Sequence, residues 1–224
     1  MLALELGPAQ VRFTDRADGD MGHGGARVTS VAAEVAARRR AVVELPWTWL
    51  RQVHGDRVVT VSSPGAGAGS RADAAVTDQA GCALAVLTAD CAPVALASPQ
   101  GVLGVAHAGW RGLEAGVLEQ TVAAMRTLGA GQIEAVLGPC IRPECYEFGS
   151  DELERLAARL GDGVRGRTTT GSTALDLPAG VALALRAAGV ARLADAGVCT
   201  ACSPGQFSWR RDREQARQAL VLWR

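Results

Sequence analysis

Three side chains of this 224-residue sequence, His54, Cys91 and His107, are of the types that bind a transition metal. Each lies at the end of a predicted strand or in a turn, in or close to a short motif that also holds a glycine or an acid. A catalytic zinc ion takes three protein ligands and keeps one position for water or substrate, and cysteine and histidine suit it. The spacing is long and irregular, so isolated structural histidines remain the alternative interpretation.

Two features beside these residues could take part in catalysis. Asp90 directly precedes Cys91, and a carboxylate there could orient a ligand or transfer a proton. The segment HAGWRG (107–112) follows a predicted strand and opens a predicted helix. The backbone amides around Gly112 and the guanidinium of Arg111 could therefore bind a phosphate or a carboxylate. The alternative is a tight turn whose glycines only supply backbone freedom.

The remaining cysteines suggest a second kind of metal site. Cys140-x4-Cys145 and Cys199-x2-Cys202 could together form a structural four-cysteine zinc site, although the first spacing is loose. The zinc-deaminase motif, the dinucleotide-binding G-x-G-x-x-G after a strand and the G-x-S-x-G nucleophile elbow are all absent from the sequence.

The composition limits the classes of function. Hydrophobic residues make up 48% of the chain, which is enough for a sizeable core, and the formal net charge is zero. We therefore expect no nucleic-acid or membrane partner. All 23 basic residues are arginine, because the chain contains no lysine. This excludes a Schiff-base lysine and a P-loop lysine, so any bound anion must be held by arginine or by backbone amides.

The N-terminal segment has no basic stretch before its apolar residues, and no apolar run reaches the roughly 18 residues of a membrane span. We therefore expect a cytoplasmic protein whose cysteines are thiols or metal ligands rather than disulfides. No internal repeat or linker is evident, which favours one domain over residues 1–224, present as a monomer or a weak homo-oligomer.

The elements that must position these residues alternate between strands and helices. The apolar runs at 82–87 and 92–97 are too short for typical helices and are typical of strands buried on both faces. The pattern predicts an α+β protein, an α/β-type sandwich of mixed β-sheets flanked by helices. Helices are predicted over 29–44, 112–128, 150–160 and 178–189. The other strands are predicted within 2–13, 46–55, 57–62, 102–110, 133–139, 191–200, 206–212 and 219–224.

Seven short stretches, which run in order over most of the chain, resemble the YfiH family. This family is also described as a multicopper polyphenol oxidase or laccase-domain family, as purine nucleoside phosphorylases and, for some members, as peptidoglycan editing factors. The seven stretches are QVHG (52–55), ADAAVT (72–77), LTADCAPVAL (87–96), HAGWRG (107–112), LGPCIRPECYEFG (137–149), CT (199–200) and SWRRD (208–212). In addition, FTDR (13–16) resembles the family's N-terminal arginine motif.

The resemblance implies a zinc ion held by His54, Cys91 and His107, and a fold similar to the catalytic domain of cytotoxic necrotizing factor toxins. It implies phosphorolysis of adenosine, inosine and methylthioadenosine, and deamination of adenosine, with a purine nucleoside and phosphate as partners. We expect Asp90, Arg111 and Cys91 to be catalytic. Residues expected to bind substrate are Arg16, Gln52, Gly112 and Arg211.

The sequence departs from the family at two segments. ADGDMGHGG (17–25) replaces the Ser-Leu-Asn-Leu-Gly that usually follows the N-terminal arginine, and REQAR (213–217) replaces a glycine-rich segment. Laccase chemistry is excluded by the histidine count. A multicopper centre needs about ten histidines, whereas the chain has three. Copper could occupy the zinc site only adventitiously.

Two other functions stay open. Cys91 and His107 could be the nucleophile and base of a cysteine hydrolase or amidase that acts on peptidoglycan precursors. The chain could also be a partner protein without enzymatic activity in division or envelope assembly.

Overall fold

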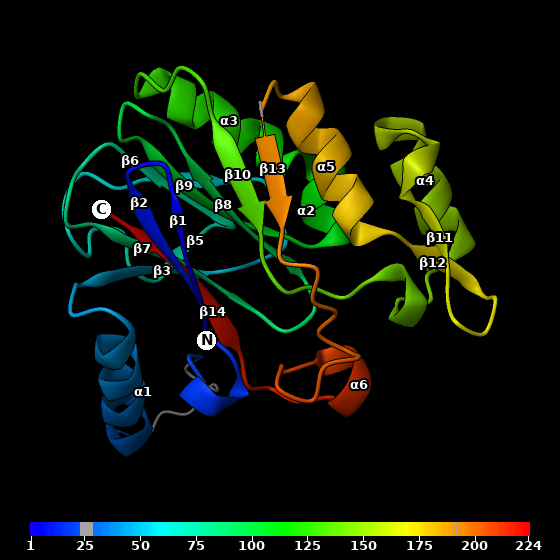
Figure 1. The fold of residues 1–224 in the computed structure, drawn as a ribbon, viewed down its shortest axis with the longest axis horizontal. Coiled ribbons are helices and arrows are strands. Elements are labelled where there is room, and N and C mark those ends of the chain that lie inside the picture. Colours follow the sequence, from blue (N-terminus) through cyan, green and yellow to red (C-terminus); the bar gives the residue numbers. More distant parts are fainter. Residues whose placement is uncertain (23–28, 191) are drawn as a thin grey trace.

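Two six-stranded sheets packed face to face form the centre of the molecule, and helices cover them from outside (Figure 1). The computed structural model describes residues 1–22, 29–190 and 192–224. The strands are β1 (Leu2–Leu6), β2 (Ala9–Phe13), β3 (Trp47–Arg51), β4 (Val58–Thr60), β5 (Ser70–Arg71), β6 (Ala74–Thr77), β7 (Ala83–Thr88), β8 (Ala92–Ala97), β9 (Leu103–Ala108), β10 (Glu134–Leu137), β11 (Arg165–Arg167), β12 (Thr173–Leu175), β13 (Arg192–Asp195) and β14 (Gln218–Trp223). The helices are α1 (Thr29–Val42), α2 (Trp110–Ala115), α3 (Val117–Thr127), α4 (Ser150–Leu160), α5 (Leu177–Ala187) and α6 (Trp209–Asp212), with short 3-10 turns η1 (Arg16–Asp18), η2 (Pro143–Cys145) and η3 (Asp162–Val164).

Both large sheets mix parallel and antiparallel neighbours. The first sheet has the order β1-β2-β14-β7-β3-β5, and the second has the order β13-β10-β8-β9-β6-β4. In the first, β3 runs parallel to β7 and β5, whereas β14 is antiparallel to β2 and β7. The mixed sheets flanked by helices confirm the fold class expected from the sequence.

The strands of the second sheet separate two cores. Alternate residues of β8 and β9 face opposite ways, as strand geometry requires. Ala95 and Val105 belong to the core between the two sheets, whereas Val94 and Ala106 belong to the core beneath the helices. All residues of both strands are buried, which confirms the expectation of burial on both faces for 92–97.

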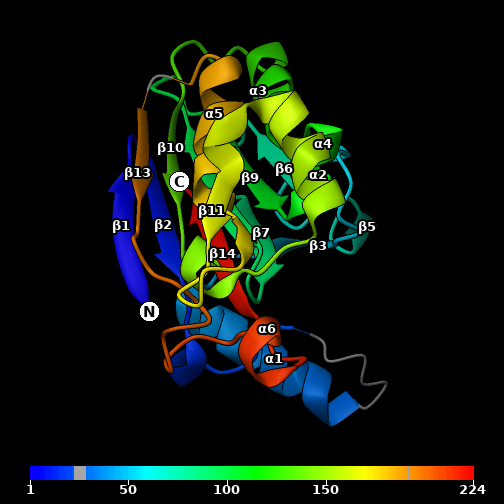
Figure 2. The ribbon, with the colours of Figure 1, turned by 90° about the vertical axis from the view of Figure 1, so that its right-hand side faces the viewer.

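The helices form the outer layers. Helices α2, α3, α4 and α5 lie together on the outer side of the second sheet (Figure 2). A smaller apolar cluster lies on the other face of the first sheet, where Val42 of α1 packs near Ala83 and Ala85 of β7. No helix in the described part of the chain is both long and apolar enough to cross a bilayer.

Two predicted elements were wrong. The single helix predicted over 112–128 is divided into α2 and α3, because Gly116 adopts a left-handed conformation with φ 96° and ends the first helix. The strand predicted over 206–212 is a turn followed by α6. There the Ser208 hydroxyl accepts a hydrogen bond from the Arg211 amide and caps the helix.

Candidate metal centre and its cavity

Strand register brings His107 and Cys91 to one edge of the second sheet. Ala74 of β6 lies opposite Ala106 of β9. One step further along, Asp73 lies opposite His107, and the His107 amide donates to the Asp73 carbonyl at 2.7 Å. On the other side of β9, His107 lies opposite Pro93 of β8. Cys91 precedes Pro93 by two residues, and strand alternation therefore places its side chain on the same face as His107.

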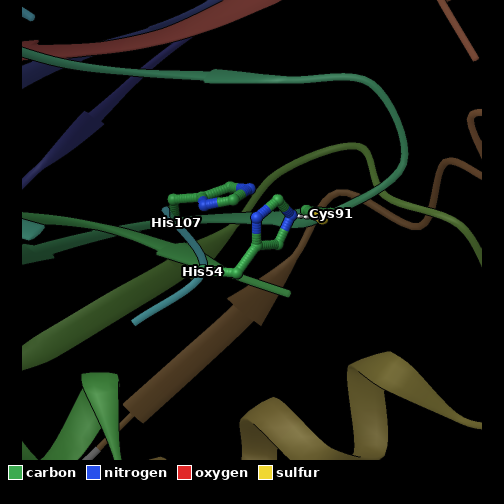
Figure 3. A group of neighbouring side chains, drawn as sticks. All are labelled: His54, Cys91 and His107. Atoms are coloured by element: carbon green, nitrogen blue, oxygen red, sulfur yellow. Dashed lines mark hydrogen bonds between the residues drawn. The ribbon is translucent and has the colours of Figure 1, made fainter. Parts of the chain in front are cut away.

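His54 reaches the same place from a turn after β3 (Figure 3). It adopts a left-handed backbone conformation, with φ 59°. The Asp73 carboxylate fixes this turn, because it accepts hydrogen bonds from the amides of Val53, His54 and Gly55 at 2.9–3.0 Å. The His54 Nε2 atom lies 3.7 Å from the Cys91 sulfur, and the three ligand atoms all lie within 4.8 Å of one another.

Asp73 also orients His107. Its Oδ1 atom accepts a hydrogen bond from His107 Nδ1 at 2.8 Å. This bond leaves Nε2 of His107 as the ligand atom, in the arrangement by which a carboxylate commonly supports a metal-binding histidine. We did not identify Asp73 as a site residue from the sequence, although it lies within the ADAAVT motif. A single acid before an apolar strand has no spacing that would reveal it.

Gly109 leaves room for a bound ion. It continues the register opposite Cys91, one step beyond the pair of Ala92 and Ala108. A Cβ atom at Gly109 would lie 2.9 Å from the His54 ring and 3.0 Å from the Cys91 sulfur. Two imidazole nitrogens and one thiolate, the donor set of His54, His107 and Cys91, fit a zinc ion with one open coordination position.

The ligands also shift one another's protonation. Burial raises the pKa of the Cys91 thiol, but the adjacent His107 and His54 rings outweigh burial and bring it down to about 6. Burial lowers the pKa of His107, but the Cys91 thiolate and the Asp73 carboxylate outweigh burial and raise it to about 9. In the metal-free protein the pair is therefore a thiolate and an imidazolium at neutral pH.

Asp90 connects the strands to the segment that carries α6. Its Oδ1 atom accepts hydrogen bonds from the hydroxyls of Thr200 and Ser208 at 2.7 and 2.8 Å, and its Oδ2 atom accepts from the Arg210 amide at 2.7 Å. The Asp90 backbone has a φ of 93°, which is unusual for a residue other than glycine. These bonds place Trp209 and Arg210 in the wall of the cavity described next.

A cavity of about 810 Å³ opens at the candidate metal centre. Asp90 is the only carboxylate among the described residues that line it. Neither Arg51 nor Arg111 has a carboxylate partner in the described part of the chain, and the Arg111 guanidinium lies over the Trp110 ring at 4.2 Å. The cavity therefore carries positive charge available to an anion. The arginines that line it are Arg51, Arg111, Arg210 and Arg217.

Arg51 was not among the residues expected from the sequence. It ends β3 as an ordinary charged residue, so only the fold shows that it borders the cavity. Gln52 also lines the cavity, but both ends of its amide are bonded to the backbone of Leu87, at 2.7 and 2.8 Å. Gly112 lies in the first turn of α2, buried against Val117 and the Gly55 carbonyl, and does not line the cavity.

The structure does not bring Arg16 and Arg211 to the cavity wall. The Arg16 guanidinium forms a bidentate salt bridge with the Glu214 carboxylate, with hydrogen bonds of 2.9 and 2.7 Å. Arg211 donates to the carbonyl oxygens of Thr200, Ser203 and Gln206. Both guanidinium groups therefore brace the segment around α6. Of the segment 17–25, residues 23–25 lie outside the described residues, and Gly22 lines the cavity.

The remaining cysteines form a smaller group than expected. Cys145, Cys199 and Cys202 lie with their sulfur atoms within 4.8 Å of one another. Cys140 is fully buried in the core beneath the helices and is not part of the group. The four-cysteine arrangement that the cysteine spacing left open is therefore reduced to three thiols.

Comparisons with known proteins agree with this architecture. A family model described as multi-copper polyphenol oxidoreductase laccase matches residues 20–224. The crystal structure of a DUF152 protein from Neisseria meningitidis superposes with a TM-score of 0.86, at 30% identity over 99% of this chain and 98% of that chain. YfiH from Bacillus licheniformis superposes with a TM-score of 0.82, at 25% identity over 96% of this chain and 92% of that chain.

Two relatives named purine nucleoside phosphorylase are similar in sequence over most of their length. One, from Streptomyces coelicolor, is 43% identical over 194 residues, which cover 85% of this chain and 80% of the relative. Another, from Streptomyces griseus, is 42% identical over 234 residues, which cover 97% of this chain and 95% of the relative. The chain belongs to the multi-copper polyphenol oxidoreductase laccase family, which is the YfiH family inferred from its motifs.

Proposed function

We propose that this protein is a zinc-dependent purine nucleoside phosphorylase that also deaminates adenosine. One observation carries the proposal: the His54–Cys91–His107 group borders the same cavity as Arg51 and Arg111, neither of which pairs with a carboxylate of the described residues. The names of the similar Streptomyces proteins support the phosphorylase activity. The cavity volume falls within the range of about 300–1,000 Å³ that is usual for small-molecule sites.

In this proposal His54, Cys91 and His107 hold the zinc ion, and Asp73 keeps His107 in the required orientation. When bound, zinc supplies a Lewis acid that stabilises negative charge or activates water in the cavity. Asp90 is placed to move a proton at Oδ2, because among the described residues that atom accepts one hydrogen bond, from the Arg210 amide.

The phosphorolysis step needs an anion held beside the ribose. Arg51 and Arg111 would hold phosphate, one oxygen of which attacks C1′ of the nucleoside. The bond from C1′ to N9 breaks, its electron pair leaves with the purine, and the purine takes up one proton. The products are the free base and ribose 1-phosphate. In deamination, water adds at C6 of adenosine and ammonia leaves, which gives inosine.

The proposal does not include laccase chemistry, although the family description contains the word laccase. A multicopper centre needs about ten histidines, and the chain has three. Copper bound at His54, Cys91 and His107 would be a substitute for zinc at the same ligands.

A mass-spectrometric assay tests the proposal. Zinc-loaded protein is incubated with adenosine, inosine or methylthioadenosine, with and without phosphate, beside a His107→Ala control. The proposal expects free base together with ribose 1-phosphate from adenosine and inosine, or 5-methylthioribose 1-phosphate from methylthioadenosine, and these products should require phosphate and disappear in the variant. Turnover by metal-free protein would contradict the role of zinc, and absence of product with all three nucleosides would contradict the phosphorylase.

The second candidate function is a cysteine hydrolase that acts on peptidoglycan precursors. Two observations favour it. The pKa of the Cys91 thiol is lowered to about 6, and Asp73 orients the adjacent His107 ring. Cys91, His107 and Asp73 thus stand in the order of nucleophile, base and orienting acid. Zinc binding and nucleophilic attack compete for the same sulfur. Rapid alkylation of Cys91 by iodoacetamide in untreated protein would favour the hydrolase, and alkylation only after chelation would favour the metal centre.

A further inference from the structure

Three free thiols lie together where two loops meet, away from the ligands His54, Cys91 and His107. Cys145 ends the turn η2, and Cys199 and Cys202 belong to the segment between β13 and α6. The sulfur atoms of Cys145 and Cys202 are 2.8 Å apart, and all three sulfurs lie within 4.8 Å of one another.

Backbone hydrogen bonds help to bring these thiols together. Cys140 and Cys199 form a parallel bridge, in which the Thr200 amide donates to the Cys140 carbonyl at 3.1 Å. The Ser203 amide donates to the Cys199 carbonyl at 3.1 Å and closes a turn that returns Cys202 toward Cys199. The Cys145 amide donates to the Arg142 carbonyl at 3.0 Å and closes η2. The group is therefore set in position by the fold itself.

The spacing of the sulfurs suits a thiophilic cation. Zinc–sulfur bonds of about 2.3 Å in a tetrahedron place the sulfur atoms about 3.8 Å apart. All three sulfur atoms already lie within 4.8 Å of one another, and Cys145 and Cys202, at 2.8 Å, would have to separate by about 1 Å to reach this spacing. Cys199 is buried while Cys202 is exposed, so the group has both a fixed base and an opening to solvent.

The protonation of the thiols points the same way. Burial and the adjacent thiols of Cys202 and Cys199 raise the pKa of Cys145 to about 12. The Cys145 thiol therefore holds its proton while no cation is present, because a neighbouring thiolate would repel it. A divalent cation removes that repulsion and releases the protons as it binds.

We propose that Cys145, Cys199 and Cys202 form a second metal site, which binds Zn²⁺ through three thiolates and leaves the fourth position to water or an external ligand. The site lies beside the cavity wall. Tyr146, which lines the cavity, follows Cys145 directly, and Thr200, which donates to Asp90, follows Cys199. A metal ion here would join the two loops that form this wall.

The test uses Cd²⁺, whose charge-transfer absorption reports the number of bound thiolates. The full-length reduced protein should bind two equivalents, with absorption from four thiolates. A His54→Ala/His107→Ala variant should bind one equivalent and retain the absorption of three thiolates. Cys202→Ser, at an exposed position in the otherwise unchanged protein, should lose about one quarter of the four-thiolate absorption and bind the second equivalent at least tenfold more weakly.

Two controls keep the result specific. Cys82→Ala removes a buried thiol in the core between the sheets and should leave both equivalents unchanged. The Cys202→Ser variant should retain Zn²⁺ at His54, Cys91 and His107, which separates failure of this site from failure of the proposed phosphorylase. Binding of a single equivalent with absorption from one thiolate would overturn the proposal. A disulfide between Cys145 and Cys202 that survives treatment with a reductant and then with Cd²⁺ would also overturn the proposal.

Discussion

Asp73 and His107 lie directly opposite each other on neighbouring strands, and the Asp73 carboxylate accepts a hydrogen bond from His107 Nδ1 at 2.8 Å. The same carboxylate accepts bonds from three consecutive backbone amides of the turn that carries His54. It is fully buried, and no other charged group of the described residues pairs with it. One carboxylate therefore positions two of the three candidate metal ligands.

Replacing this carboxylate should weaken the metal centre. In Asp73→Asn the amide that replaces one oxygen cannot accept from all four donors, so both His54 and His107 lose orientation. We expect the affinity for Zn²⁺ to fall by roughly 10–100-fold, as for other supporting residues of metal sites. Competition with a chromophoric chelator measures the change. Asp78→Asn, at an exposed position just after β6, is the matched control. Equal affinities in the two variants would contradict this role of Asp73.

A single methyl group at Gly109 should block the ion. The backbone there has φ −78° and ψ 169°, which alanine adopts freely, so the effect of Gly109→Ala comes only from contact with His54 and Cys91. Such overpacking costs about 1–3 kcal/mol, which corresponds to roughly 5–150-fold in metal affinity if the ligands absorb it. Isothermal calorimetry with Zn²⁺ measures the loss.

The control for this variant is Gly205→Ala, where an added Cβ meets nothing within 4 Å. Both variants should keep the thermal midpoint of the metal-free protein within a few degrees. A Gly109→Ala protein that binds Zn²⁺ as tightly as Gly205→Ala would show that the ion does not occupy this space.

The reactivity of Cys91 should depend on pH in a particular direction. The thiolate is the reactive form, and in metal-free protein the pKa of Cys91 is lowered to about 6. Alkylation by iodoacetamide should therefore rise as pH increases through about 6 and then level off. In His107→Ala the largest influence that lowers this pKa is lost, so the midpoint should move to higher pH. Peptide mass spectrometry measures both profiles, and identical midpoints would refute the coupling.

The cavity arginines Arg51 and Arg111 should govern phosphate use. Arg51→Gln and Arg111→Gln each remove one charge-assisted interaction, worth about 1.5–3 kcal/mol. We expect KM for phosphate to rise by roughly 10–100-fold in each, while deamination of adenosine, which uses no phosphate, changes little. Arg192→Gln, on β13 and 79% exposed, is the control. A rise in KM for the nucleoside alone would place phosphate elsewhere.

The parts of the fold that could be predicted are those in which one strong local signal dominates. The apolar run 92–97 has no polar residue on either face, and only a strand buried on both faces accommodates it. The strand prediction for residues 206–212 was wrong because the aromatic and apolar residues of this segment suggested a strand. Ser208 instead caps α6, while Asp90, far away in the chain, accepts a bond from the Arg210 amide. Such a tertiary contact leaves no pattern in the local sequence.

The candidate site divides in the same way. His54, Cys91 and His107 were found because histidine is rare in this chain and the motifs around these residues are distinctive. Asp73 and Arg51 were missed because an acid before a strand and an arginine at the end of one are common. Their importance arises from strand register, which pairs Asp73 with His107 and turns Arg51 toward the cavity.

The burial of β8 and β9 on both faces has a consequence for how long a bound ion stays. Both strands contribute to two cores at once, so neither can detach without disrupting packing on both sides of the sheet. Hydrogen exchange at the His107 amide should therefore require opening of nearly the whole molecule rather than local fraying. His54, on a turn at the surface, is the ligand that can leave first. Residence of the ion is then set by the opening of that turn, while His107, within β9, persists as a ligand as long as the folded state itself.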